Sequence, residues 1–406
     1  MPVGSRMATT IKSWIINTRA GTGEPGLAGD GGAASRASLN EPKGLAIDRA
    51  GHLFIADSEN HVVRRVDRLT GLITTVVGVA PETTPVSAHS QWMQASPHEE
   101  VDPFAEASQS TTEKFTQQTD LSGTVRYLVG AAAHKRFGGD GGPAKSAMLN
   151  FPTAVAVDAQ GHLYVADTMN HRVRRVDTQT GIITTVAGTG QARFSGDGGP
   201  ADHAALNEPA ALAVDDEGRL YIADQSNNRV RVVDLKTGLI RTLAGTGSAA
   251  YDGDDKPAAE ASLAGPSGLA LGAGGLYIAD TFNGRIRRID LSTGMISTVV
   301  DDGGEYRYQS PSEPPSSSLS RPSGIALDHK GNLFLTDSDS HLIRRWDRET
   351  GAVTRVAGIG AASYGGDGGS ALEASLCYPF GIVADRDGAL FIADTFNHRI
   401  RTLSLE

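Results

Sequence analysis

The sequence predicts an all-β fold, a six-bladed β-propeller built from four-stranded blades. The text around Leu-Tyr-Ile-Ala-Asp recurs six times, and its aspartates are separated by 110, 57, 56, 57 and 57 residues. Glycine makes up 49 of 406 residues, which is typical of many turns between short strands. The periodicity of about 3.6 residues that marks helical repeats is absent. The repeated aspartates are Asp57, Asp167, Asp224, Asp280, Asp337 and Asp394.

Each 57-residue unit divides into four short strands. In the second copy we expect strands over residues 154–158, 163–167, 172–176 and 182–186, separated by turn signals such as Gln160-Gly161 and Thr180-Gly181. The first strand keeps small residues, such as Gly44 and Gly324, which suit the crowded place nearest the axis. The second strand is apolar on both faces, as expected of a sheet packed between two others. Such units repeated around an axis form a propeller.

The two ends of the sequence predict how the ring closes. The last copy stops after its third strand, Arg399 to Leu403, while residues 13–18 match the text of a fourth strand. We therefore expect the N-terminal strand to complete the sixth blade, which leaves no free inner edge. On this interpretation residues 1–406 form one propeller domain.

One segment departs from the period, because the first gap between aspartates is 110 residues rather than 57. The irregular text runs from about residue 80 to residue 122, between blades 1 and 2. Its length approaches that of a blade, but it lacks the Leu-Tyr-Ile-Ala-Asp text, which argues against a seven-bladed ring. Long insertions in compact domains often serve as lids or binding loops. We expect this one to cover the ring, anchored by Trp92, Met93 and Phe104.

Composition and charge argue against several classes of binding partner and site. Net charge is −10, from 37 basic and 47 acidic residues, which disfavours nucleic acid because phosphate binding depends on clustered Lys and Arg. The single cysteine, Cys377, excludes an intrachain disulfide and a cysteine-rich zinc site. No apolar run reaches the about 18 residues of a membrane span. No secretory signal is visible, so we expect a cytoplasmic location. The sequence leaves any cofactor unknown.

The repeat resembles a known family. The motif Leu-Tyr-Ile-Ala-Asp-Thr-x-Asn-x-Arg-Ile-Arg, seen at residues 276–287, and the loop Gly-Asp-Gly-Gly-Pro-Ala, seen at residues 196–201, resemble NHL-repeat propellers of the bacterial kind. The resemblance covers essentially all of the chain except the insertion and implies the propeller fold. It implies no single function, because relatives with this repeat include peptidyl-hydroxyglycine lyases, RNA- or protein-binding modules and extracellular sensor domains.

The residues repeated from blade to blade are interpreted as structural. The six aspartates are suited to turn bonds between second and third strands, and third-strand residues such as Arg172 and Arg174 are suited to pairing with carboxylates. Histidines that follow the turn asparagine, His61, His171 and His398, and His341 at the matching place, are also expected to pack the turn. Asn228 and Gly284 replace them in the other two blades, which excludes a closed ring of imidazoles. The Gly-Asp-Gly loops lack the carboxylate spacing of a calcium site, so no metal site is predicted.

The positions at which blades differ point to a functional site. The loops that enter the first strands and the turns after the second strands share one face of a propeller, around the mouth of its channel, where small ligands usually bind. The position after the repeated proline reads Lys43, Thr153, Ala210, Ser267, Ser323 and Phe380. Candidate acid–base and anion-binding residues are Glu41, Glu59, Glu208, Asp339 and Arg321. Candidate apolar ligand-binding residues are Phe151, Met169, Phe282, Tyr378, Phe380, Phe396 and, from the insertion, Trp92.

Two hypotheses about function follow from this pattern. The first is a small-molecule binding or catalytic site at the channel mouth, where rim carboxylates would serve a lyase, a hydrolase or an isomerase. The alternative is a protein–protein interaction scaffold that uses the same face, or the blade edges, without catalysis. An enclosed pocket would favour the first hypothesis, and a broad flat rim would favour the second.

Overall fold

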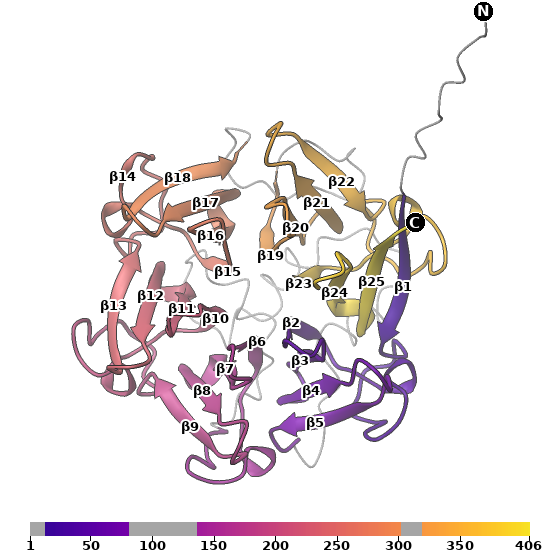
Figure 1. Ribbon diagram of the computed structural model, residues 1–406, viewed down its shortest axis with the longest axis horizontal. Helices are drawn as coiled ribbons and strands as arrows, with labels where there is room; N and C mark the ends of the chain where they lie inside the picture. Colours follow the sequence, from indigo (N-terminus) through magenta and orange to yellow (C-terminus); the bar gives the residue numbers. More distant parts are fainter. Residues whose placement is uncertain (1–12, 81–135, 302–318) are drawn as a thin grey trace, which may run out of the picture.

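The computed structural model describes residues 13–80, 136–301 and 319–406 and confirms the predicted architecture. Six antiparallel sheets surround a central axis, each with its first strand innermost and its fourth strand outermost (Figure 1). Most second strands are followed by a three-residue 3-10 turn, such as η3 (Thr168–Asn170). Apolar side chains of neighbouring blades form shared clusters between the sheets.

The blades follow one another in chain order. Blade 1 comprises β2 (Pro42–Ile47), β3 (Leu53–Asp57), β4 (Val62–Val66) and β5 (Ile73–Val77), and blade 2 comprises β6 (Pro152–Val157), β7 (Leu163–Asp167), β8 (Arg172–Val176) and β9 (Ile183–Ala187). Blade 3 comprises β10 (Pro209–Val214), β11 (Arg219–Asp224), β12 (Arg229–Asp234) and β13 (Leu239–Ala244), and blade 4 comprises β15 (Pro266–Gly272), β16 (Gly275–Asp280), β17 (Arg285–Asp290) and β18 (Met295–Val300). Blade 5 comprises β19 (Pro322–Leu327), β20 (Leu333–Asp337), β21 (Leu342–Trp346) and β22 (Val353–Ala357), and blade 6 comprises β23 (Pro379–Ala384), β24 (Leu390–Asp394), β25 (Arg399–Leu405) and β1 (Trp14–Ala20).

Blade 4 carries a short fifth strand, β14 (Lys256–Pro257), on its outer edge, where Lys256 lies opposite Ile296. The loops before blades 1, 2, 3 and 6 make the same contact as a single bridge, for example between Pro143 and Ile182. The loop that leads into each of these blades therefore covers part of the blade's own outer edge, a place where unpaired backbone would otherwise invite association.

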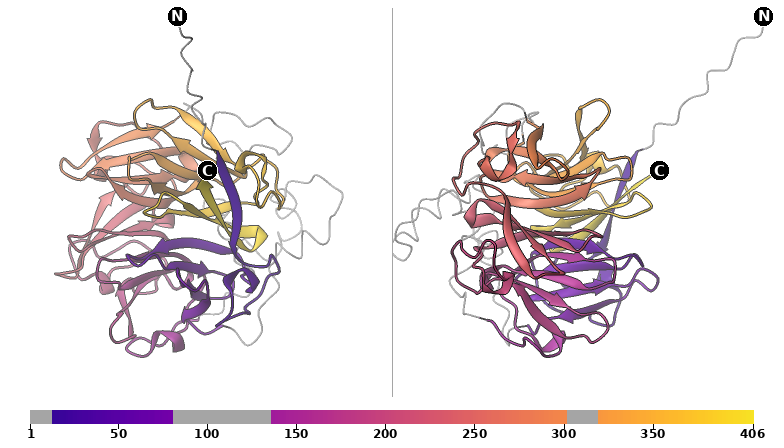
Figure 2. Two further views of the ribbon diagram at one scale, coloured as in Figure 1. Left: turned by 45° about the vertical axis from the view of Figure 1, so that its right-hand side comes forward. Right: turned by 60° about the vertical axis from the view of Figure 1, so that its left-hand side comes forward.

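The N-terminal strand completes blade 6, as predicted. β1 pairs with β25 in antiparallel register, from Trp14 opposite Leu405 to Ala20 opposite Ile400. The first and last described strands of the chain therefore lie side by side, as Figures 1 and 2 show. The outermost strand of blade 6 thus comes from the opposite end of the chain, and the ring is closed by main-chain hydrogen bonds.

The innermost strands approach one another closely, which explains their small residues. A Cβ atom on Gly268 would lie 2.0 Å from the carbonyl oxygen of Ser323 in the next blade, and one on Gly381 would lie 2.0 Å from that of Lys43. Each inner strand contacts the inner strands of both neighbouring blades. Even the methyl group of alanine would force the strands to shift at these two glycines, so the position stays small around the channel.

A buried aspartate at the end of each second strand fixes the turn that follows. Asp224 is fully buried and accepts hydrogen bonds of 2.7 Å from the Asn207 N–H and 2.8 Å from the Asn227 side-chain amide. The fully buried Arg231 of β12 donates to the same carboxylate at 3.3 Å. Burial raises the pKa of Asp224 to about 6, and these three donors oppose the shift, so the group is ionised at neutral pH. The structural interpretation of the repeated aspartates is confirmed.

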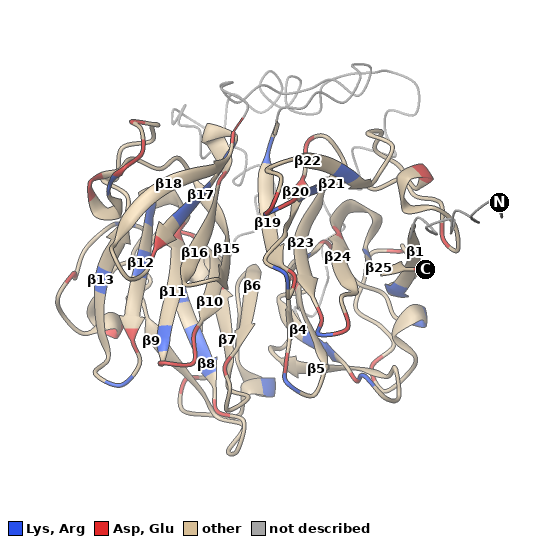
Figure 3. Ribbon diagram, turned by 45° about the horizontal axis from the view of Figure 1, so that its top comes forward, with Lys and Arg blue, Asp and Glu red and all other residues tan. Residues whose placement is uncertain are grey.

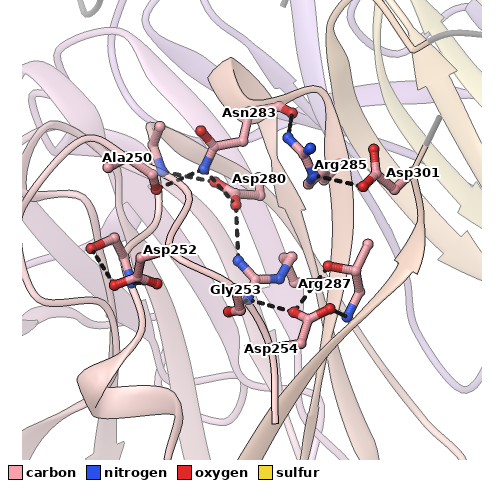
Figure 4. Close-up of polar contacts among 12 residues, drawn as sticks. Ala250, Asp252, Gly253, Asp254, Asp280, Asn283, Arg285, Arg287 and Asp301 are labelled. Carbon is pink, nitrogen blue, oxygen red and sulfur yellow. Dashed lines mark hydrogen bonds and ion pairs between the residues drawn. The ribbon is translucent and has the colours of Figure 1, made fainter. Parts of the chain in front are cut away.

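The same arginine also binds the loop that precedes the blade. In blade 4, Arg287 lies 3.4 Å from Asp280 and 2.9 Å from Asp254 of the loop (Figure 4). Asp254 in turn accepts two 3.0 Å hydrogen bonds from Thr298 of the fourth strand. One guanidinium therefore joins the loop to the second, third and fourth strands. The corresponding loop aspartates of blades 1, 2, 3 and 6 are Asp30, Asp140, Asp197 and Asp367.

The first basic residue of the third strand does not pair with a carboxylate in blade 2, contrary to expectation. Arg172 stacks on the ring of Phe137 at 3.8 Å and donates to the carbonyl oxygens of Asn170 and Thr189. Blades 3, 4 and 6 contain the same stack, formed by Arg229 on Phe194, Arg285 on Tyr251 and Arg399 on Tyr364. Basic and acidic residues are interspersed along the blades (Figure 3).

Histidine side chains link neighbouring blades at the rim. Nδ1 of His341 accepts a 3.1 Å hydrogen bond from the N–H of Tyr378, whose φ of 46° is left-handed. Equivalent bonds join Phe151 to His61, Glu208 to His171 and Glu41 to His398. In blade 3 the side-chain oxygen of Asn228 accepts the bond from Gly265, at 2.9 Å. The predicted turn-packing role of the histidines is confirmed, and it fixes the strained residue before each following proline.

Removing residues 1–20 should strongly destabilise the ring, because it deletes the outer strand of blade 6 and exposes the edge of β25. We expect a melting temperature many degrees lower, or insoluble protein, in thermal denaturation. A chain lacking only residues 1–12 keeps every β1 pair and serves as the control. A 1–20 deletion as stable as this control would contradict the closure described above.

Replacing Asp224 by alanine should lower the free energy of unfolding by about 3–5 kcal/mol, because it leaves Arg231 as a buried charge without this partner. Chemical denaturation measures the effect, and Asp202→Ala, at an exposed site, is the matched control. Equal stability of the two variants would show that the repeated aspartate does not hold the blade.

Replacing His341 by asparagine should preserve the link to blade 6, as Asn228 does in blade 3, and remove a pH dependence. Burial lowers the pKa of His341 to about 4, opposed by Asp337, whereas an unfolded histidine titrates near 6.5. The wild type therefore loses stability as pH falls from about 6.5 towards 4, because only the unfolded chain gains the proton.

Relative to the wild type, the His341→Asn variant should gain about 1–2 kcal/mol between pH 7 and pH 5, measured by denaturant unfolding at each pH. The carboxylates titrate alike in both chains, so the comparison isolates the imidazole. A stability difference that does not change with pH would contradict the assignment of a neutral, hydrogen-bonded histidine.

Candidate functional site

A cavity of about 130 Å³ lies at the mouth of the axial channel and is lined by residues of all six blades. Its polar lining includes Lys43, Thr153, Gln225, Ser267, Thr281, Arg321 and Ser323. Phe151 and Phe380 supply aromatic surface. The structure therefore brings three of the predicted site residues, Arg321, Phe151 and Phe380, to one cavity.

Lys43 forms the first charged unit of this cavity. Its side chain is buried, and Nζ lies 4.0 Å from the ring centroid of Phe151 in the next blade and 4.0 Å from Oε2 of Glu41. Among the described residues, Nζ has no hydrogen-bond partner. Burial lowers the pKa of Lys43; Glu41 and Glu59 oppose this shift, and Arg321 adds to it. The ammonium is thus held by a ring and a carboxylate at the limit of ion pairing.

Arg321 forms the second charged unit. It is 4% exposed, its Cζ lies 5.5 Å from the ring centroid of Phe380, and its Nη1 lies 3.6 Å from Oδ1 of the buried Asp339. Its backbone N–H donates to Asp337 at 3.0 Å, which fixes the start of β19. Each unit therefore combines one cation, one ring and one carboxylate.

The two units use the same backbone positions in opposite order. Lys43 follows the repeated proline and Phe151 precedes the next one, whereas Arg321 precedes the proline and Phe380 follows the next one. The units consequently span two different junctions, between blades 1 and 2 and between blades 5 and 6. Both cations contribute to the cavity wall, and within the described part of the chain that wall contains no Asp or Glu.

Glu59, in the turn after β3, belongs to the same charge cluster. Burial and the charge of Glu41 together raise the pKa of Glu59 to about 8, against the opposing effect of Lys43. Its carboxyl group is therefore largely protonated at neutral pH, which is the state that a proton donor needs. The arrangement supports anion binding and offers one acid close to it.

The other predicted residues surround the cavity without lining it. Glu208 is buried and accepts a hydrogen bond from Ser226. Tyr378 packs edge-on against His341 and Phe396, with ring centroids 4.5 and 5.1 Å apart, beside Cys377. Met169 and Phe282 are partly buried in the turns of blades 2 and 4. Trp92 and nearly all of the insertion lie outside the described residues, so the lid stays a prediction.

Lys43 is the functional candidate that sequence reasoning did not select. In the sequence, a lysine after the proline does not by itself indicate a binding site. It becomes a candidate because the structure places the ring of Phe151, from the next blade, over its ammonium group. A comparison of the six blades contains the clue, because only blade 1 has a charged residue after the proline and only blade 5 has a basic one before it.

Residues 13–80, 136–301 and 319–406 contain no group of three or more His, Cys, Asp or Glu side chains placed to hold a metal ion. No helix in these ranges combines the length and the apolar character that a membrane span requires.

Relatives of the chain are found in plants and animals. A family model described as the teneurin NHL domain matches residues 17–97, 130–195 and 190–252, just over half of the chain. The chloroplastic protein SUPPRESSOR OF QUENCHING 1 of Arabidopsis thaliana is 31% identical over 276 residues, covering 65% of this chain and 26% of that protein. NHL repeat-containing protein 2 of Bos taurus is 28% identical over 317 residues, covering 70% and 43%. The chain thus spans less than half the length of these relatives.

Solved propellers share the fold at low sequence identity. An auxiliary nutrient binding protein from Bacteroides thetaiotaomicron matches with a TM-score of 0.58 at 16% identity, over 97% of this chain and 77% of that one. A gluconolactonase from Xanthomonas campestris matches with a TM-score of 0.51 at 14% identity, over 91% and 87%. The matches span plants, animals and bacteria, so they do not single out the bacterial kind of propeller. The repeated text, the six-bladed ring and the family match together show that the chain belongs to the NHL-repeat family represented by the teneurin NHL domain.

Proposed function

We propose that this chain binds a small molecule with a carboxylate group at the mouth of the axial channel. The observation that carries the proposal is the pair Lys43 and Arg321, two buried cations in the wall of one cavity. Buried charges are stable only when they are paired, and the internal partners lie at 4.0 and 3.6 Å, beyond good hydrogen-bond distance. A ligand carboxylate would supply the missing acceptors.

The remaining surface of the cavity suits the rest of such a ligand. Phe151 and Phe380 offer apolar walls, and the hydroxyls of Thr153, Ser267 and Ser323 offer polar contacts. The volume of about 130 Å³ is below the about 300–1,000 Å³ typical of drug-sized sites, which favours a ligand of few heavy atoms. The descriptions of the solved relatives as a nutrient binding protein and a gluconolactonase agree with a small-molecule site.

Catalysis at the same site is a second candidate, supported by Glu59. A lyase, hydrolase or isomerase needs a proton donor near the ligand, and a carboxyl group with a pKa of about 8 holds its proton at neutral pH. Of the other predicted acid–base groups, Glu41 and Asp339 lie beside the two cations. In this proposal, the carboxylates of Glu41 and Asp339 balance the positive charges of Lys43 and Arg321.

Calorimetric titration with acetate, lactate and pyruvate, each against its uncharged amide, tests the proposal. We expect the acids to bind and the amides not to bind. Arg321→Gln should weaken binding about 10- to 100-fold, because a charge-assisted hydrogen bond contributes about 1.5–3 kcal/mol. Arg348→Gln, at an exposed position, is the matched control, and thermal melts of both variants check folding.

Equal binding of acids and amides would contradict recognition of the carboxylate. Two results together would favour the protein–protein interaction scaffold instead. None of the small acids would bind, and a partner protein would shield the channel mouth from solvent.

A further inference from the structure

We propose that Lys43 forms an imine with the carbonyl group of a small 2-oxo acid held at the channel mouth. The inference rests on the proposed carboxylate site and specifies its ligand class. Arg321 would hold the carboxylate, and the adjacent carbonyl carbon would face Nζ of Lys43.

The surroundings of Lys43 leave its amine without a hydrogen-bond acceptor. The residue is one of those that line the cavity, its side chain is only 6% exposed, and Nζ is buried with no hydrogen-bond partner among the described residues. Buried ammonium groups in protein interiors are normally saturated with acceptors. Lys43 instead has one carboxylate at 4.0 Å and one ring face at 4.0 Å, so a carbonyl group in the cavity would meet an amine that no acceptor holds.

Burial and a nearby cation ease the loss of a proton from the Lys43 ammonium, which gives the amine that the reaction needs. Burial lowers the pKa of Lys43, and Arg321 lowers it further, against the opposing effect of Glu41 and Glu59. Depressed lysine pKa values are the usual means by which proteins make an amine nucleophilic near neutral pH. A surface lysine such as Lys330 lacks this burial.

The reaction balances without an oxidant or a reductant. The neutral amine attacks the carbonyl carbon, and one amine hydrogen passes to the carbonyl oxygen to give a carbinolamine. Its hydroxyl group takes up one further proton and leaves as water, and a protonated C=N bond replaces the C=O bond. Glu59, in the same charge cluster, would supply that proton and become ionised. The protonated imine carries the charge of the original ammonium, so the Phe151 ring and the Glu41 carboxylate would stabilise it in the same way.

Reductive trapping tests the inference. The full-length protein is incubated with pyruvate and sodium cyanoborohydride, digested, and mapped by mass spectrometry for a reduced pyruvyl adduct. We expect the adduct at Lys43 at least tenfold above that at any other lysine, and none with lactate, which has no carbonyl group. Lys43→Arg keeps the positive charge and should lose the adduct, whereas Lys330→Arg should retain it.

The outcomes separate this inference from the proposed function. Trapping at Lys43 supports both. Calorimetric binding of pyruvate and lactate with equal affinity, and no adduct at Lys43, overturns the imine while the carboxylate site stands. No binding of either acid overturns both. Because the adduct is located in the wild-type protein, the result does not depend on the folding of the Lys43→Arg variant.

Discussion

The buried pairing of an aspartate with an arginine is the interaction on which each blade depends. In blade 3, Arg231 contacts Asp224 at the end of the second strand and Asp197 in the preceding loop, and Asp197 reaches Thr242 on the fourth strand. Removing two charges from water is costly, and the cost is offset only where every donor and acceptor is used. Each repeated fragment of the sequence therefore belongs to one network, which explains why the Gly-Asp loop, the Asp-x-x-Asn turn and the third-strand arginine recur together.

This repeated network leaves the channel mouth free to vary. The residue before each proline is held by its backbone N–H, through a histidine or asparagine of the preceding blade in five junctions and through Asp337 in the remaining one. Because the donor of this hydrogen bond is the backbone N–H, the bond forms whatever side chain that residue carries. A six-fold frame can therefore present Phe151 at one junction and Arg321 at another, and the asymmetric cavity arises from a symmetric scaffold.

The fold was predicted almost completely from the sequence, because the repeat period, the turn residues and the similarity of residues 13–18 to a fourth strand are visible in the sequence itself. The pairing of β1 with β25 was among its predictions. The site was reached in part: Arg321, Phe151 and Phe380 line the cavity, while Glu208 and Tyr378 do not. Which rim side chains point inward depends on contacts between blades, such as Phe151 over Lys43, and these contacts join residues 108 positions apart. The expected pairing of Arg172 failed for a similar reason, since its aromatic partner lies in the preceding loop.

The closure of blade 6 has a consequence for how the protein is made. β1 is the first described strand to be synthesised and β25 is the last, so β1 has no partner until residues 399–405 have left the ribosome. Blades 1 to 5 contain all four of their strands within single stretches of sequence and are able to fold in order as they emerge. Until β25 arrives, β1 carries an unpaired edge, which is the kind of segment that chaperones recognise and that associates wrongly between chains. Ring closure is thus a long-range step that must wait for the last strand of the ring, and the slower it is, the longer the nascent chain is exposed to misassembly.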